Sequence, residues 1–286
     1  MTNPSVTGFY HEPSGSIAYL VRDPTSAHAA IVDPVLDFDE KAGRVSTEAA
    51  DALLEAVRKD SLTIDWILDT HAHANHFSAA AYLKDKLGAP TAIGVEIIGV
   101  QKTWRTIYNQ PDFPADGSQW DRLFADGDTF ETGGLRWSVM HSPGHTSASI
   151  TYRVGDCAFM HDTLFQPDSG TARCDFPGAN AGQLYDSIRK ILALPDDTRL
   201  FTGHDYRPNS RPAQWQSTVA EQKSANTHFK DNPTRESYVG MREKRDKTLP
   251  MPRLILHALQ VNIRGGRLPQ PEGNGRSYLK IPVGAL

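Results

Sequence analysis

Three histidines fall within six residues at one point of the chain, and they constrain what it can fold into more than any other feature. His71, His73 and His76 follow directly after the strand-like run 66–69. Side chains two residues apart project to the same side of an extended segment, so His71 and His73 are expected to face together. Neutral imidazole is the commonest side-chain metal ligand near neutral pH. The spacing therefore predicts a metal site at the end of a strand.

A single histidine is more often a helix cap or a surface residue than a metal ligand. Three at this spacing favour a metal site, but two or three nearby ligands cannot complete a coordination shell. The remaining ligands must therefore come from other segments of the chain.

The rest of the chain supplies strands and helices in an order typical of an α/β protein. Residues 16–22, 29–32, 64–69 and 91–93 are rich in β-branched and other apolar side chains and are predicted to be strands. Helical spacing of apolar residues predicts helices at 46–59, 77–87 and 95–109. After residue 123 the pattern is mostly β, with strands at 135–140, 149–154, 157–160 and 198–202, a helix at 182–194 and a helical run around 218–227.

Further metal-ligand candidates stand at the ends of these later strands. His145 lies in a loop that Pro143 and Gly144 make irregular, and Asp162 follows a buried strand, where an acidic residue needs a reason. Strand alternation predicts that His161 points away from whatever Asp162 faces. His204 follows the last strand of the unit. Such residues, gathered at one edge of a sheet sandwich, are expected to form a site on loops.

Composition excludes several other classes of protein. The formal net charge is −4, and no cluster of Lys and Arg suggests a nucleic-acid partner. No run of eighteen uncharged apolar residues predicts a membrane span, and the start of the chain has no signal-peptide pattern, so we expect a soluble, cytoplasmic protein. Cys157 and Cys174 are expected to be free thiols.

The histidine motif His71–His76, the segment 142–146, Asp162 and Gly203-His204 resemble the metallo-β-lactamase fold in order. More narrowly, residues 162–164, 170–176 and 202–206, with 241–245 and 249–254 in the tail, resemble the persulfide dioxygenase (sulfur dioxygenase) branch, in particular its bacterial β-lactamase-like members. The resemblance implies an α/β fold, an αββα sandwich of two mixed β-sheets flanked by helices. It also implies a catalytic domain at 1–208 and a C-terminal extension, 209–286, packed on that domain.

The resemblance further implies one Fe(II) per chain, held by His71, His145 and Asp162 as the catalytic and metal-binding set, with His73 in or just outside it. The implied reaction uses O₂ to oxidise a small-molecule persulfide, such as glutathione persulfide, to sulfite and thiol. Arg173 and Tyr206 are expected to contact the substrate's carboxylates and sulfur. A salt bridge from Arg173 to Asp175 is the structural alternative. A homo-oligomer and a sulfurtransferase partner are left open.

Asn75 departs from the family pattern, which has aspartate at this position. An amide oxygen is a weaker ligand than a carboxylate, so a second or vestigial metal site of Asn75, His76 and His204 should be impaired. This counts against the alternative function, a glyoxalase II-like thioesterase or related hydrolase with Zn(II) or Fe. A metal-binding or sulfur-sensing module is the non-enzyme alternative. The sequence leaves open whether Asn75 lowers activity or only removes the second site.

Overall fold

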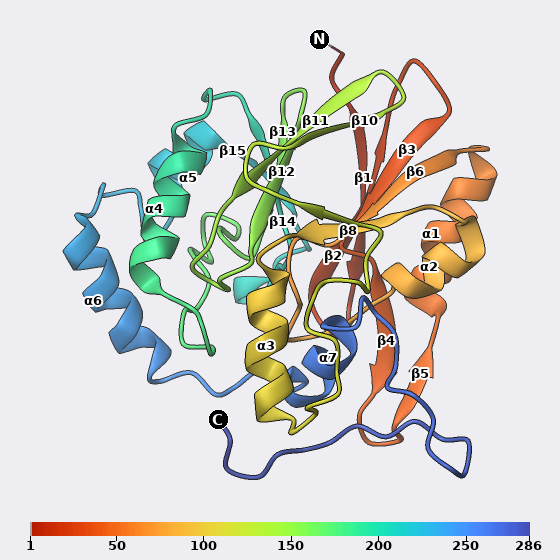
Figure 1. The fold of residues 1–286 in the computed structure, drawn as a ribbon. Helices are drawn as coiled ribbons and strands as arrows, with labels where there is room; N and C mark the ends of the chain where they lie inside the picture. The colour runs from red at the N-terminus through yellow and green to blue at the C-terminus, as the bar shows by residue number, and fades with distance from the viewer. Residues whose placement is uncertain (1) are drawn as a thin grey trace.

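The computed structural model describes residues 2–286, and in that range the chain folds around two six-stranded sheets (Figure 1). The first sheet has the order β1-β2-β3-β6-β8-β9, with strands β1 (Ser5–His11), β2 (Ser16–Arg22), β3 (His28–Val32), β6 (Thr63–Leu68), β8 (Thr91–Gly94) and β9 (Arg122–Phe124). Strands β1, β2 and β3 are antiparallel, whereas β3, β6, β8 and β9 run parallel. This sheet is therefore mixed, as predicted.

The second sheet has the order β10-β11-β12-β13-β14-β15. Its strands are β10 (Thr129–Thr132), β11 (Leu135–His141), β12 (Ile150–Val154), β13 (Cys157–His161), β14 (Arg199–Thr202) and β15 (Gln216–Thr218). Only the β13–β14 pair is parallel among these neighbours. A small third sheet joins β5 (Arg44–Ser46), β4 (Val35–Asp39) and β7 (Phe77–Ser78).

Helices cover the outer faces of the two large sheets. They are α1 (Glu48–Lys59), α2 (Ala80–Leu87), α3 (Ile97–Ile107), α4 (Ala181–Leu192), α5 (Val219–Ala225), α6 (Arg235–Asp246) and α7 (Ile255–Asn262), with a short 3₁₀ turn at Pro208–Ser210. Buried residues of α1, α2 and α7 pack on the first sheet, and those of α4 pack on the second. The result is the αββα sandwich that the resemblance implied.

The alternation of β2 shows how the sequence builds these layers. Ile17, Tyr19 and Val21 belong to the core cluster between the sheets, where they meet Trp137 and Phe159 of the second sheet. The intervening Ala18 and Leu20 belong to the outer cluster under α1 and α2. A strand covered on both faces needs apolar residues at nearly every position, which explains its continuous apolar run.

The expected helix at 77–87 begins later than predicted. Phe77 and Ser78 pair with β4 as the short strand β7, and the helix α2 starts at Ala80. The Phe77 side chain is fully buried and stacks on Phe38 at 4.4 Å between ring centroids. Helical spacing over residues 77–87 could not reveal this pairing, because its partner lies about forty residues earlier.

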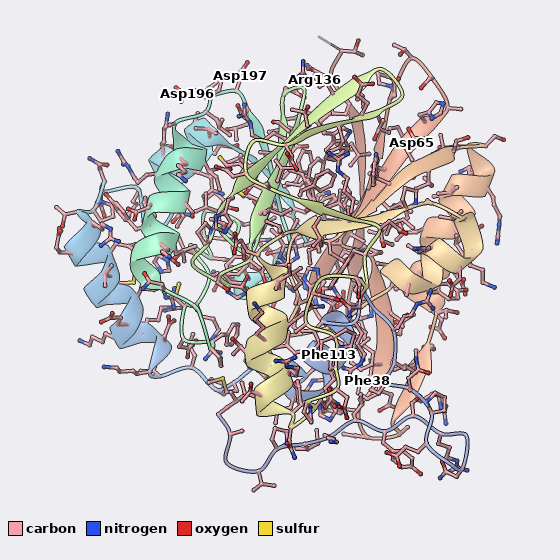
Figure 2. All side chains as sticks on the ribbon, in the orientation of Figure 1. Phe38, Asp65, Phe113, Arg136, Asp196 and Asp197 are labelled. Carbon is pink, nitrogen blue, oxygen red and sulfur yellow. The ribbon has the colours of Figure 1, made fainter. Side chains whose placement is uncertain are left out.

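Residues 209–286 pack against both large sheets and add one strand to the second. Strand β15 pairs with β14, α6 packs beside α4, and α7 contributes to the core clusters under the first sheet. Figure 2 labels Phe38 and Phe113, and both rings pack near α7: Phe38 beside His257, and Phe113 in the same cluster as Ile255. The boundary at residue 208 stays a prediction. Within residues 2–286, the helices are all too short or too polar to cross a membrane.

Candidate metal centre

The loop that follows β6 is held in place by a buried carboxylate, Asp33. Asp33 accepts hydrogen bonds from the backbone N–H of Thr70 at 2.7 Å and from the Thr70 hydroxyl. The Nε2 of His73 also lies 3.1 Å from Asp33 Oδ1. Burial lowers the pKa of His73, but the neighbouring carboxylates, Asp33 first and then Asp69 and Asp162, together outweigh burial and raise the pKa. These contacts fix the direction of His73 and leave its Nδ1 without a hydrogen-bond partner among the described residues.

His145 reaches the same place from the second sheet. Its Nδ1 donates to the backbone carbonyl of Arg173 at 2.9 Å, which leaves Nε2 facing Asp162 Oδ2 at 3.6 Å. The loop needs glycine at 144, because a Cβ there would lie 2.3 Å from the Leu184 backbone and the residue has a φ of 139°. Helix α4 can therefore pack directly against the loop that carries His145.

Asp162 lies at the centre of the cluster, and its two oxygens face different histidines. Oδ2 lies 3.9 Å from His71 Nε2 and 3.6 Å from His145 Nε2, while Oδ1 lies 2.5 Å from His204 Nδ1. Burial raises the pKa of Asp162, but the His204 and His145 imidazoles outweigh it and hold the pKa below its usual range. Asp162 is therefore a buried carboxylate anion among imidazoles.

The predicted set of His71, His145 and Asp162 fits a metal ion. One ligand atom from each lies within 4.8 Å of the other two, and the three residues are 1%, 5% and 8% exposed. His71 Nε2 is buried without a hydrogen-bond partner in the described part of the chain, and burial lowers the pKa of His71 well below its usual range. A neutral imidazole with a free buried nitrogen is suited to a cation, because an unsatisfied buried polar atom is otherwise costly.

His161 does not point away from Asp162, and this prediction was wrong. Its Nδ1 lies 3.2 Å from Asp162 Oδ1, and its ring centroid lies 4.4 Å from that of His71 and 4.5 Å from that of His73. The pairing of β13 with β14 shifts register between Phe159 and His161, and His161 has a φ of 41°. The prediction assumed that side chains alternate between the two faces of the strand up to Asp162. That alternation stops before His161, so both side chains can turn to the same side.

Asn75, His76 and His204 are neighbours, and one polar atom of each side chain lies around the Ser16 hydroxyl. Ser16 Oγ joins them, since it lies 3.0 Å from His76 Nδ1, 2.9 Å from His204 Nε2 and 3.1 Å from Asn75 Nδ2. Asn75 Nδ2 also contacts His204 Nε2, and the His76 and His204 ring centroids are 6.2 Å apart. One ligand atom of His204 also lies within 4.8 Å of ligand atoms of His161 and Asp162.

A cavity of about 490 Å³ opens onto this cluster. His145, Asp162 and His204 line its inner end, and its side walls include Phe165 and Phe176. The segment 249–254, between α6 and α7, forms part of the wall. A cavity of this size accommodates a small-molecule substrate with its reacting end at the histidines.

The two predicted substrate-binding residues both line this cavity. Tyr206 is 63% exposed, and its ring stacks on His204 with 6.1 Å between centroids. The Arg173 guanidinium is already engaged: Nε and Nη2 each donate to Asp175 at 2.6 Å, and Nη1 donates to the Pro250 carbonyl at 2.6 Å. The structural alternative left open by the sequence describes Arg173 better than substrate binding does.

The sequence reasoning missed two residues of this centre, Asp33 and His161. Asp33 directly follows the buried strand β3, which is the same signal that singled out Asp162. His161 immediately precedes Asp162, and only the left-handed backbone at the strand end turns it inward. The first could have been found by applying one criterion consistently, whereas the second depends on tertiary structure.

The fold and the cluster together define a sheet sandwich with a group of side chains at its edge that can hold a metal ion. Residues 12–204 match the family model described as the metallo-beta-lactamase superfamily. The chain belongs to that superfamily.

Its relatives include proteins with different names. A beta-lactamase hydrolase-like protein of Xylella fastidiosa is 60% identical over 283 residues, 99% of this chain and 65% of the relative. This chain thus spans about two thirds of that relative's length. A probable metallo-hydrolase of Burkholderia pseudomallei is 48% identical over 99% of this chain and its own full length. The mitochondrial persulfide dioxygenase ETHE1 of Bos taurus is 27% identical over 90% of this chain and 87% of its own.

Among solved structures, ETHE1 from Myxococcus xanthus superimposes with a TM-score of 0.74 and 29% identity. The match covers 92% of this chain and all of that one. The similarity extends beyond residue 204, where the family model ends.

Proposed function

We propose that the chain is an iron-dependent persulfide dioxygenase acting on glutathione persulfide or a similar small persulfide. The observation that carries the proposal is the set of two histidines and one carboxylate, His71, His145 and Asp162, of which His145 and Asp162 line the cavity. Sets of this composition leave coordination positions open and are typical of non-haem Fe(II) oxygenases. The likeness to ETHE1 proteins, by sequence and by fold, supports the same reaction.

Iron bound by this set would supply the redox chemistry by which O₂ oxidises the terminal sulfur. In the overall reaction, glutathione persulfide, O₂ and water give glutathione, sulfite and two protons. The chain's own residues prepare the site for this: Asp33 fixes the direction of His73, and the Arg173 carbonyl fixes that of His145. Pre-positioned ligands avoid reorganisation when a metal binds.

The carrier half of the substrate would occupy the outer cavity. Phe165 and Phe176 offer apolar surface there, and Arg245 is an exposed cation that lines the cavity. Among the described residues, none forms an ion pair with Arg245, in contrast to Arg173 and Arg242, which pair with Asp175 and Asp246. We therefore assign the grip on the carrier's carboxylates to Arg245 in place of Arg173, because a free guanidinium can bind a carboxylate with two hydrogen bonds.

A metal-dependent hydrolase is the second candidate, and the names of the Xylella and Burkholderia relatives favour it. Hydrolases of this kind use a metal-bound hydroxide, commonly between two ions. The amide of Asn75 counts against that arrangement at the usual position, since it contacts His204 and Ser16 where a carboxylate ligand would be needed.

The two functions are separated by anaerobic purification, metal analysis and two assays on the same preparation. The dioxygenase predicts iron and O₂ uptake with glutathione persulfide, with one sulfite formed per O₂. Hydrolysis of S-lactoylglutathione with no O₂ uptake in the presence of the persulfide would support the hydrolase and overturn the proposal.

A further inference from the structure

A chain of hydrogen bonds leads from Asp162 to the turn between β1 and β2. Its inner member is His204, whose Nδ1 lies 2.5 Å from Asp162 Oδ1 and whose Nε2 lies 2.9 Å from Ser16 Oγ. Ser16 Oγ lies 2.8 Å from Ser14 Oγ, and Ser14 Oγ lies 2.6 Å from His11 Nδ1. Ser16 and His204 are each 1% exposed, so the inner part of this chain is shielded from bulk water.

His11 ends this chain of hydrogen bonds beside a second cavity. That cavity, of about 190 Å³, is lined by residues of β1, β2, β4 and α1, His11 among them, and it is large enough to hold water. Asp37 Oδ1 lies 3.0 Å from His11 Nε2, and Asp37 Oδ2 accepts a hydrogen bond from the backbone N–H of Ala49 at 2.9 Å. Asp37 therefore accepts from Nε2–H and leaves Nδ1 of His11 as the acceptor that faces Ser14. The His11 side chain is 12% exposed, so it can exchange a proton with solvent.

Each group in this chain can accept a proton on one side and donate one on the other. A hydroxyl has one donor and two acceptor sites, and an imidazole has two nitrogens. A proton that arrives at His204 Nδ1 therefore lets His204 Nε2–H pass its own proton to Ser16. Ser16 then donates to Ser14, and Ser14 donates to His11 Nδ1. His11 becomes an imidazolium and gives a proton to water, so no charge stays in the interior.

Both candidate reactions create a need for such a path. Oxidation of a persulfide by O₂ and water releases two protons per turnover, and hydrolysis of a thioester releases one. Asp162 and His204 line the inner end of the main cavity, which the substrate would occupy. Protons released there need a route that the substrate does not block, and the buried hydroxyl of Ser16 provides its first step.

We propose that His204, Ser16, Ser14 and His11 form a proton relay from the metal centre to solvent, with His11 as the exit group. The relay rests on turnover at the metal centre, as the proposed function does, but it serves a dioxygenase and a hydrolase alike. The group that gains and loses a proton at the surface is His11, whose side-chain partners are Ser14 and Asp37.

The first test is steady-state kinetics of the iron-loaded full chain in dilute buffer. His11→Ala should lower kcat for glutathione persulfide roughly 10-fold or more, because the last acceptor of the relay is gone. Added imidazole should restore kcat in a saturable manner, since it can occupy the space beside Ser14 and take the proton there. His28→Ala is the matched control, because His28 pairs with Asp65 at 2.8 Å outside the relay. This variant should keep its kcat and show no response to imidazole.

The outcomes separate a relay from a structural role. An unchanged kcat in His11→Ala would overturn the proposal, and so would a loss that imidazole does not restore. Ser16→Ala in the His11→Ala background should abolish the rescue, because the relay is then broken on its inner side; rescue that persists would contradict the proposal. Wild type that hydrolyses S-lactoylglutathione without O₂ uptake would end the proposed function, and the same comparisons made on hydrolysis would decide on the relay.

A second readout needs no turnover. NMR of the metal-free chain labelled with ¹⁵N-histidine reports on each ring nitrogen, and His11→Gln identifies the signals of His11. Ser16→Ala should shift the His11 Nδ1 signal across two hydrogen bonds, because it removes the partner of Ser14. Ser26→Ala is the control, since the Ser26 hydroxyl donates to Asp23 in the turn between β2 and β3, and it should leave that signal unchanged. An unaffected His11 signal in Ser16→Ala would show that the chain of hydrogen bonds is interrupted and would overturn the relay.

Discussion

At the scale of single residues, the site depends on oxygen acceptors that fix the direction of its imidazoles. Asp33 orients His73 through Nε2, and the Arg173 carbonyl orients His145 through Nδ1. In each case one ring nitrogen is engaged and the other is left toward the cluster. Such outer contacts typically change metal affinity or activity by roughly 10–100-fold when they are removed.

The ligand set makes the first prediction at this scale. His71→Ala, His145→Ala and Asp162→Ala should each lose tightly bound iron, because a three-ligand site cannot spare one ligand. Metal content per folded chain is the measurement, with circular dichroism to confirm the fold. His257→Ala, which alters a histidine packed beside Phe38 outside the site, should keep its iron. Full iron content in any of the first three variants would mean that the ligand set is wrong.

The free guanidinium of Arg245 makes the second prediction. Arg245→Ala should raise the KM for glutathione persulfide roughly 10-fold with kcat nearly unchanged, as expected when a charge-assisted hydrogen bond to the carrier is lost. A persulfide without carboxylates should show no change. Arg173→Ala should instead lower kcat for both substrates, because its guanidinium holds Asp175 and Pro250 and its carbonyl holds His145. The same KM effect with both substrates would remove Arg245 from carboxylate binding.

At the scale of elements, the adjacent ends of β13 and β14 assemble the buried half of the site. The two strands run parallel, so their C-terminal ends deliver His161-Asp162 and Gly203-His204 to the same edge of the sheet. The register shift at the end of β13 then turns His161 over Gly203. Each strand end is sterically matched to the other.

The close contact between the His161 ring and Gly203 predicts how much stability is lost when a methyl group is added at residue 203. Gly203→Ala should lower the free energy of unfolding of the metal-free chain by about 1–3 kcal/mol, the range found for overpacked cores. In the His161→Ala background the same change should cost less than about 1 kcal/mol, because the ring is gone. Urea unfolding of the four proteins in this double-mutant cycle provides the measurement. Equal costs in both backgrounds would show that the ring does not fill the space beside Gly203.

A second element-scale contact joins the loop before Cys174 to residues after α5. His228 Nδ1 accepts a hydrogen bond from the backbone N–H of Thr171 at 3.1 Å. Burial, with a smaller contribution from Arg242, lowers the pKa of His228 to about 4, from 6.5 in an unfolded chain. The stabilisation is therefore present above pH 6.5 and is lost as the pH falls toward 4.

Comparison with His228→Gln isolates this effect from other titrating groups. Wild type should lose roughly 1–2 kcal/mol of stability relative to the variant between pH 7 and pH 4.5, a figure reduced for the partial exposure of the ring. The measurement is urea unfolding of both proteins at each pH. A difference that stays constant with pH would mean that His228 keeps its ordinary pKa in the fold.

At the scale of the whole molecule, local sequence patterns predicted the main strands of the sandwich but not all of its strands. The strands β2, β3 and β6 were predicted within one residue at each end, because apolar runs bounded by turn residues are strong local signals. Strands β1, β4, β5 and β7 were missed. The strand β7 has only two residues and pairs with β4 more than forty residues earlier, so no local pattern reports it. The β4–β5 hairpin is local, but Asp37, Asp39 and Arg44 interrupt its apolar pattern. The loops that carry the candidate ligands could be placed as well, because each of them directly follows a strand that the sequence predicts.

What the sequence could not predict at this scale was how the last eighty residues close the cavity. The Pro-rich segment 249–254 carries no metal ligand, yet it forms part of the cavity wall. Helix α7 also stabilises the histidine loop. Its Asn262 Nδ2 donates to the backbone carbonyls of His73 and His76 at 2.7 and 2.8 Å. These contacts span almost two hundred residues of sequence, so no local pattern reports them.

The central claim is that this chain holds iron with His71, His145 and Asp162 and uses it to oxidise a persulfide with O₂. Its most direct test is oxygen-electrode measurement with glutathione persulfide on anaerobically purified chain of known metal content. The account predicts about one tightly bound iron per chain, O₂ uptake that scales with iron content, and one sulfite formed per O₂ consumed. Two tightly held zinc ions per chain and no O₂ uptake after loading with Fe(II) would contradict it.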